Sequence, residues 1–98
     1  MSEGGETDTA VDIRQVTIQN KRGLHARASA KFAGEAEKYQ AEILVSKDGN
    51  EVVGTSIMGL MMLAAAKGES ITLKSSGVDA GIALDALSQL IADKFGED

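Results

Sequence analysis

Two kinds of hydrophobic periodicity alternate along this chain, and their order restricts its fold more than any other feature of the sequence. Alternation with a period of two residues, typical of half-buried strands, marks four short segments: Asp12–Gln19, Glu42–Lys47, Glu51–Val53 and Ser70–Ser75. Helical spacing marks three segments: Ala26–Tyr39, Ser56–Ala66 and the stretch from Asp79 to Phe95. The resulting order, βαββαβα, predicts an α+β domain in which helices cover one face of a four-stranded antiparallel sheet.

Turn and cap signals locate the ends of these segments. The sequence Asp48-Gly49-Asn50 between two apolar runs predicts a tight hairpin. Thr55 or Ser56 is expected to cap the second helix, and Asp79 the last one. We expect Gly68 to end the second helix, because glycine readily adopts the left-handed conformation that commonly follows a helix.

The apolar positions of these segments predict the hydrophobic core. In the first strand the expected inward side chains are Ile13, Val16 and Ile18. In the first helix the inner face consists of Ala30, Phe32, Ala33 and Ala36. In the last helix it consists of Ala80, Ala83, Leu84, Leu87, Leu90 and Ile91.

Composition excludes several classes of function. The 98 residues suffice for one domain, which we expect to span residues 11–98 behind a disordered acidic tail at Met1–Ala10. A net charge of -5 and an aromatic content of 3% argue against nucleic-acid binding. The absence of cysteine and the single histidine exclude disulfides, thiolate catalysis and Cys- or His-rich metal sites, so we expect neither metal nor cofactor. Without a long apolar run or a secretory signal, we expect a cytoplasmic protein that does not bind membranes.

The segment Gly23-Leu24-His25-Ala26-Arg27 is the strongest candidate site. His25 falls at the N-cap of the first helix, where unpaired backbone N–H groups and the helix dipole favour a neutral, nucleophilic ring and a bound anion such as phosphate. Arg27 on the first turn can fold its guanidinium over the same anion. No second titratable group is expected nearby. The alternative is an exposed histidine that only caps the helix.

The second helix carries more apolar side chains than one buried face needs. If Leu60 and Leu63 point inward, the side chains left outside are Ile57, Met58, Met61 and Met62. Such a Met-rich patch suits a surface that docks several partners in turn. A helix that is buried on both sides is the alternative. Ser56 at the start of this helix is either a simple cap or a phosphorylation site.

These features together resemble HPr, the phosphocarrier family of the bacterial phosphotransferase system. Gly23-Leu24-His25-Ala26-Arg27 is similar to the family's active-site signature, usually Gly-Leu-His-x-Arg-Pro-Ala, and Thr55-Ser56-Ile57-Met58-Gly59-Leu60 is similar to its regulatory-serine signature. The resemblance extends from Asp12 to Phe95. The variant sequences at both motifs look most like the alphaproteobacterial form of the nitrogen-related, regulatory branch, often called NPr.

The resemblance implies a fold, a function and a set of partners. It implies an open-faced β-sandwich and a phosphoryl carrier rather than a free-standing enzyme, and we expect the protein to be a monomer. His25 would accept a phosphoryl group on Nδ1 from phospho-enzyme I, which draws it from phosphoenolpyruvate, and pass it to an EIIA-type protein, with Arg27 as electrostatic partner. Ser56 would be phosphorylated by HPr kinase/phosphorylase. The implied docking residues are Ile57, Met58, Gly59, Met61 and Met62.

Two positions depart from the family pattern. Ala28 stands where proline is usual, and we expect the helix to begin there with a somewhat less rigid first turn. Arg22 stands where many members have asparagine, and no role is transferred to it. Two other functions compete with the carrier: an adaptor domain that uses the Met-rich helix without phosphorylation of His25, and a small acylphosphatase-like hydrolase, for which no phosphate-cradling loop is evident.

Overall fold

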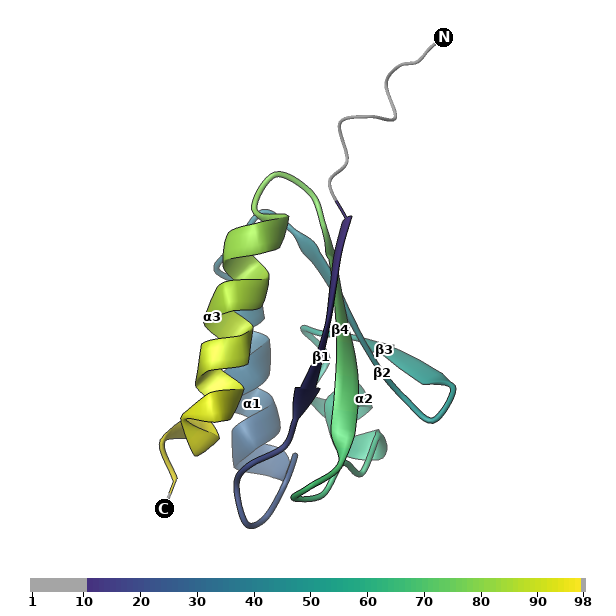
Figure 1. The fold of residues 1–98 in the computed structure, drawn as a ribbon, viewed down its shortest axis with the longest axis vertical. Helices are drawn as coiled ribbons and strands as arrows, with labels where there is room; N and C mark the ends of the chain where they lie inside the picture. Colours follow the sequence, from purple (N-terminus) through teal and green to yellow (C-terminus); the bar gives the residue numbers. More distant parts are fainter. Residues whose placement is uncertain (1–10, 98) are drawn as a thin grey trace, which may run out of the picture.

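A four-stranded sheet with helices on one face forms the molecule (Figure 1). The computed structural model describes residues 11–97, so the predicted tail at residues 1–10 lies outside the described part. The elements are β1 (Val11–Thr17), α1 (Ala26–Ala36), β2 (Glu42–Lys47), β3 (Asn50–Val53), α2 (Ile57–Met62), β4 (Ser70–Ser76), α3 (Ala80–Ala92) and a 3-10 helix, η2 (Lys94–Gly96). The predicted order βαββαβα is confirmed. No helix within residues 11–97 has the length and hydrophobicity that a membrane span requires.

The strands lie in the order β1-β4-β2-β3, and every neighbouring pair is antiparallel. The β2–β3 hairpin closes at Asp48 and Gly49, whose φ angles of 52° and 86° are the left-handed values that a two-residue turn requires. Lys47 and Asn50 are consequently paired across the turn. The hairpin prediction is confirmed.

The first strand faces the helices with a different set of side chains from the predicted one. Val16 and Ile18 lie on the helix side, but Ile13 is 66% exposed on the opposite face of the sheet. Residues of a strand alternate between faces, so the even-numbered positions of β1 face the helices. Arg14 occupies the position next to Ile13 on that side and bonds to Asp85 and Ser88 of α3 at 2.9 and 3.2 Å. The predicted inward position of Ile13 is wrong.

The inner face of α1 is shifted by a fraction of a turn from the predicted face. Its buried residues are Ala28, Ser29, Phe32, Ala33 and Ala36. Their spacing of three and four residues is that of one helical stripe, and Ala30 falls outside it and is exposed. The helix also ends at Ala36, before the predicted end at Tyr39.

The second helix ends earlier than the sequence predicts. It stops at Met62, and Ala64 takes the left-handed conformation with a φ of 53°. The chain turns here because the carbonyl of Ala65 accepts a hydrogen bond from the amide of Leu24 at 3.0 Å, which a continued helix would not allow. Gly68 therefore does not end the helix; its amide donates to Ile18 at 2.9 Å.

The last helix differs from the predictions at both ends. Asp79 precedes α3, but its carboxylate accepts the amide N–H of Gln40 at 2.7 Å instead of capping the helix. At the other end α3 stops at Ala92, and Lys94, Phe95 and Gly96 have φ angles of 58°, 55° and 77°. This left-handed turn buries Phe95 in the core and folds the chain back toward the start of α1.

Candidate functional site

His25 lies at the N-cap of α1, as the sequence predicts. Its backbone is extended, with φ -73° and ψ -179°, and its Nδ1 accepts the amide N–H of Arg27 at 3.3 Å. The loop before it is held by Gly23, whose φ of 65° suits glycine, and by the Leu24–Ala65 hydrogen bond. The ring is therefore fixed where the unpaired amides of the first helical turn meet solvent.

Asn20 ties this loop to the C-terminal segment. Its buried side chain donates from Nδ2 to the carbonyl oxygen of Gly23 at 2.8 Å and to Oε1 of Glu97 at 3.0 Å. The sequence offered no signal for this role. The bond to Gly23, 3 positions away, is made to a backbone oxygen, and Glu97 lies 77 positions away along the chain.

A carboxylate lies against the other nitrogen of the His25 ring. Nε2 of His25 contacts Oε2 of Glu97, and only 14% and 17% of the two side chains are exposed. The expectation that no titratable group lies near His25 is therefore wrong. Burial opposes ionisation of Glu97, but hydrogen bonds from Asn20 and His25 outweigh it, so the pKa of the Glu97 carboxyl lies below its ordinary value. Sequence reasoning missed Glu97 because it placed Phe95 at the end of a helix.

The two contacts of the imidazole ring require the same tautomer. Nδ1 accepts a hydrogen bond from a backbone amide, so it carries no proton in this arrangement. Nε2 then carries the proton and donates a hydrogen bond to the Glu97 carboxylate. The unprotonated nitrogen is Nδ1, on the side of the helix N-terminus.

A cationic groove of about 380 Å³ runs beside this ring. Its charged lining residues are Lys21, Arg22, Arg27, Lys31 and Glu97. Arg27, on the first turn of α1, lines this groove, and so does Arg22, to which the family resemblance transferred no role. The amine of Lys31 donates to the carbonyl oxygen of Phe95 at 2.7 Å.

Ala28 confirms that the first turn forms without proline. It is fully buried and lies in α1, two residues after the start of the helix. Alanine has the most favourable helix propensity, so the substitution does not interrupt the helix.

The Met-rich helix α2 exposes the side chains that the sequence left outside. Ser56 caps it by accepting the amide N–H of Gly59 at 2.9 Å, while Leu60 is fully buried. Met58 and Met62 are 72% and 76% exposed, and together with Ile57 and Met61 they line an apolar hollow of about 450 Å³. Within residues 11–97 nothing covers them, so α2 is not buried on both sides.

Gly59 has a packing role in this helix. A β-carbon at this position would lie 3.0 Å from both the Ser56 hydroxyl and the Val52 side chain. Gly59 is half-buried between the cap and β3, so it lets α2 pack closely against this strand.

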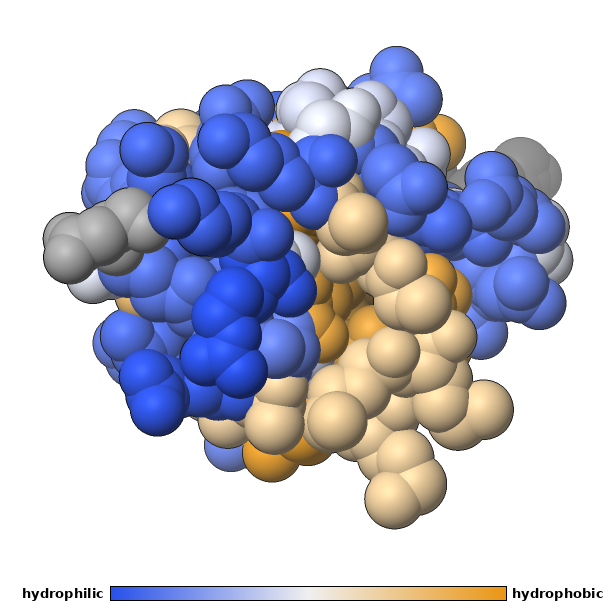
Figure 2. Space-filling view, turned by 90° about the horizontal axis from the view of Figure 1, so that it is seen from below, coloured by the Kyte–Doolittle hydropathy of each residue, from blue (hydrophilic) through white to orange (hydrophobic). Residues whose placement is uncertain are grey.

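Figure 2 views the end of the molecule where α2 lies, and shows an apolar surface directly beside a strongly hydrophilic one.

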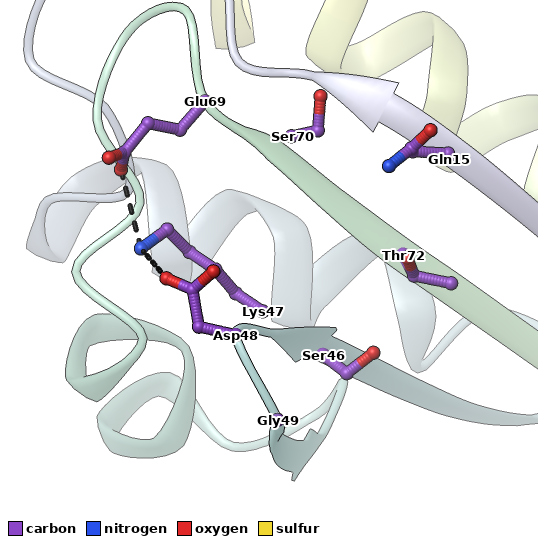
Figure 3. Close-up of a pocket in the computed structure, with 8 residues that line it drawn as sticks. All are labelled: Gln15, Ser46, Lys47, Asp48, Gly49, Glu69, Ser70 and Thr72. Carbon is purple, nitrogen blue, oxygen red and sulfur yellow. Dashed lines mark hydrogen bonds and ion pairs between the residues drawn. The ribbon is translucent and has the colours of Figure 1, made fainter.

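A further hollow, of about 480 Å³, lies away from His25 (Figure 3). Figure 3 shows the Lys47 amine between the carboxylates of Asp48 and Glu69, at 3.0 and 3.4 Å. The remaining residues there are uncharged, among them Gln15, Ser46 and Thr72. Its one cation is already paired, and none of the predicted site residues lines it. Within residues 11–97 no group of three His, Asp or Glu side chains is arranged to hold a metal ion.

The fold and the His25 segment together define a class of protein. The family model described as "PTS HPr component phosphorylation site" matches residues 13–93. The chain belongs to the HPr family of phosphocarrier proteins of the phosphotransferase system.

Relatives of known sequence and structure agree with this assignment. The phosphocarrier protein HPr of Cupriavidus necator is 50% identical over 84 residues, covering 86% of this chain and 94% of that protein. The phosphocarrier protein NPr of Shewanella violacea is 46% identical over 84 residues, covering 86% and 92%. A crystal structure of HPr from Thermoanaerobacter tengcongensis superposes with a TM-score of 0.85 at 41% identity, covering 89% of this chain and 98% of that one. An HPr dimer from the same organism matches with a TM-score of 0.71 at 44% identity, covering 84% of this chain and 94% of that one.

Proposed function

We propose that His25 accepts a phosphoryl group on Nδ1 from phospho-enzyme I and passes it to an EIIA-type protein. The observation that carries this proposal is the arrangement of the ring, which directs the unprotonated Nδ1 toward the amide groups at the start of α1. Those amides suit the oxygens of a phosphoryl group, and the helix dipole favours its negative charge. The N–P bond forms at Nδ1 as the bond from phosphorus to the donor breaks.

The surroundings of His25 suit a transient attachment. The contact between Nδ1 and the Arg27 amide lies at an exposed position, and the groove next to the site supplies positive charge from Arg22 and Arg27. Arg27 lies on the first turn of α1 with an exposed side chain, and in this proposal it contacts the phosphoryl oxygens during transfer. The protein is then a carrier whose partners complete each transition state, rather than a free-standing enzyme.

The exposed α2 surface supplies the docking site in this proposal. Its apolar side chains, Ile57, Met58, Met61 and Met62, adapt readily to different partners because methionine is flexible and polarisable. Gly59 lies beneath them. Enzyme I and the EIIA-type acceptor therefore share one surface, and the carrier acts as a monomer when it meets either of them.

Ser56 adds regulation to this scheme. HPr kinase/phosphorylase would place a phosphate at the start of the docking helix, where it puts about -1.5 to -2 charges beside Ile57 and Met58. The similarity to NPr supports the proposal that the protein serves the nitrogen-related, regulatory branch of the phosphotransferase system.

Transfer of labelled phosphate tests the proposal directly. Incubation with enzyme I and ³²P-phosphoenolpyruvate is expected to label the wild type with an acid-labile, base-stable phosphate, and to leave His25→Ala unlabelled. Ser56→Ala is the matched control that keeps the acceptor and is expected to be labelled. Label that persists in His25→Ala would contradict the assignment.

A second function is favoured by the exposed α2 surface alone. An adaptor would bind partners through Met58 and Met62, and His25 would only cap α1. In that case the wild type binds enzyme I or an EIIA-type protein but remains unlabelled in the same assay.

A further inference from the structure

We propose that Glu97 is a positioning residue for the His25 reaction, which it supports by holding the proton on Nε2 and by balancing the charge that develops on the ring. This inference rests on the proposed phosphoryl transfer to His25. It starts from the contact between Glu97 Oε2 and His25 Nε2, which lies on the opposite side of the ring from the Nδ1–Arg27 contact.

The first part of the role concerns the tautomer. An ionised carboxylate can only accept a hydrogen bond, so the ring nitrogen that faces it, Nε2, must carry the proton. Nδ1 then keeps its electron pair. A neutral imidazole without such a partner can place its proton on either nitrogen. Glu97 therefore reinforces, from the Nε2 side, the tautomer that the Arg27 amide also requires and that can attack phosphorus from the helix side.

The second part concerns charge. When the electron pair of Nδ1 forms the N–P bond, the bond from phosphorus to the donor atom breaks and that atom leaves with its electron pair. No proton has to move, so the ring of His25 becomes cationic with its proton still on Nε2. The carboxylate of Glu97 faces this proton and stabilises the positive charge, as a buried acid does for the histidine of a nucleophile–base pair.

The segment that carries Glu97 is built into the fold. Phe95 is fully buried although its φ is 55°, and the amine of Lys31 holds its carbonyl oxygen at 2.7 Å. Left-handed backbone is unfavourable for a residue other than glycine, so the burial of the Phe95 side chain must outweigh this strain. Asn20 fixes the other carboxylate oxygen at 3.0 Å, which leaves Oε2 directed at the ring.

Two variants separate the two parts of the role. Glu97→Gln removes the charge but keeps an oxygen that can accept from Nε2, whereas Glu97→Ala removes both. Glu42→Gln on β2 is the matched control, because it makes the same change of charge at an exposed position in a different element. Melting temperatures of all variants verify that they are folded.

The measurements are the rate of His25 phosphorylation by phospho-enzyme I and the ¹⁵N NMR shifts of the His25 ring in the unphosphorylated protein. Both Glu97 variants are expected to slow phosphorylation by roughly ten- to a hundredfold, and Glu97→Ala alone is expected to lower the fraction of the Nε2–H tautomer. Glu42→Gln is expected to match the wild type in both readouts.

Either readout can overturn the inference. Wild-type rates in both Glu97 variants would show that the carboxylate is a bystander. An unchanged tautomer fraction in Glu97→Ala would overturn the positioning role, whether or not the wild type is phosphorylated. A wild type that is not phosphorylated would instead contradict the proposed function.

Discussion

Gly23 lies so close to Ala65 that a β-carbon on Gly23 would stand 2.2 Å from the carbonyl oxygen of Ala65. The neighbouring amide of Leu24 donates to that same oxygen at 3.0 Å. The loop that carries His25 is therefore joined directly to the chain that leaves the Met-rich helix α2. The reactive segment and the proposed docking surface are held in register by a contact that tolerates no side chain.

Gly23→Ala is expected to destabilise the protein by at least about 2 kcal/mol, because it adds a clash with Ala65 to the cost of a left-handed alanine. Chemical denaturation measures the loss. Gly49→Ala is the matched control, since Gly49 also has a positive φ, of 86°, but faces open space. The control is expected to lose only about 1 kcal/mol. Equal losses in the two variants would show that the close approach to Ala65 is unimportant.

Arg27→Ala is expected to slow phosphoryl transfer to and from His25 by roughly ten- to a hundredfold, because a charge-assisted contact to the phosphoryl group is lost. The fold should be unaffected, since the Arg27 side chain is exposed. Stopped or quenched-flow transfer assays with each partner measure the rates. Lys67→Ala removes an exposed cation outside the groove and should leave them unchanged. Rates for Arg27→Ala that match the wild type would assign the guanidinium no part in transfer.

Ser56 variants distinguish a cap from a regulatory site. Ser56→Ala loses the hydrogen bond to Gly59 and is expected to lower stability by about 1 kcal/mol. Ser56→Asp keeps an acceptor at the cap, so its melting temperature should change little, but its charge should slow enzyme I-dependent phosphorylation of His25. Ser70→Asp adds the same charge at the exposed first residue of β4 and serves as control. If Ser56→Asp is phosphorylated as fast as the wild type, and the kinase leaves the wild-type serine unmodified, Ser56 is only a cap.

The Glu97 carboxyl makes stability depend on pH. Its pKa is lowered in the folded protein, so its ionised form contributes stability that is fully present above its ordinary value of 4.5 and is lost as the pH falls below it. The wild type is therefore expected to melt above Glu97→Gln at pH 6 to 7, and the difference should shrink steadily toward about pH 3. Thermal melts of both proteins across this range test the sign. A difference that stays constant would mean that the carboxylate is not held by Asn20 and His25.

Local patterns predicted the parts of this structure that local forces determine. The cap at His25, the hairpin at Asp48-Gly49-Asn50 and the outward side of α2 depend on a few consecutive residues, and all three predictions are confirmed. The predicted inward face of β1 was wrong at Ile13. Arg14 faces the helices and bonds to α3, but in the sequence a charged residue is indistinguishable from one that faces solvent.

The parts that failed depend on contacts between distant segments. Ala64 and Phe95 adopt left-handed backbone that no alanine or phenylalanine signals in a sequence, and each does so where the chain must meet the His25 loop or the core. Glu97 could not be assigned because its place beside His25 follows from that turn. The candidate site was therefore predicted on its Nδ1 side and missed on its Nε2 side.

The placement of the docking helix beside the reactive loop also sets the order of events in a relay. If donor and acceptor both dock on this helix, as proposed, a donor seated on Met58 and Met62 would exclude the acceptor. Transfer through such a carrier would follow ping-pong kinetics, because the donor would dissociate before the acceptor binds. Very tight docking would then make a slower relay, because dissociation would become the limiting step. An apolar patch of only four side chains suits a partner that has to leave quickly.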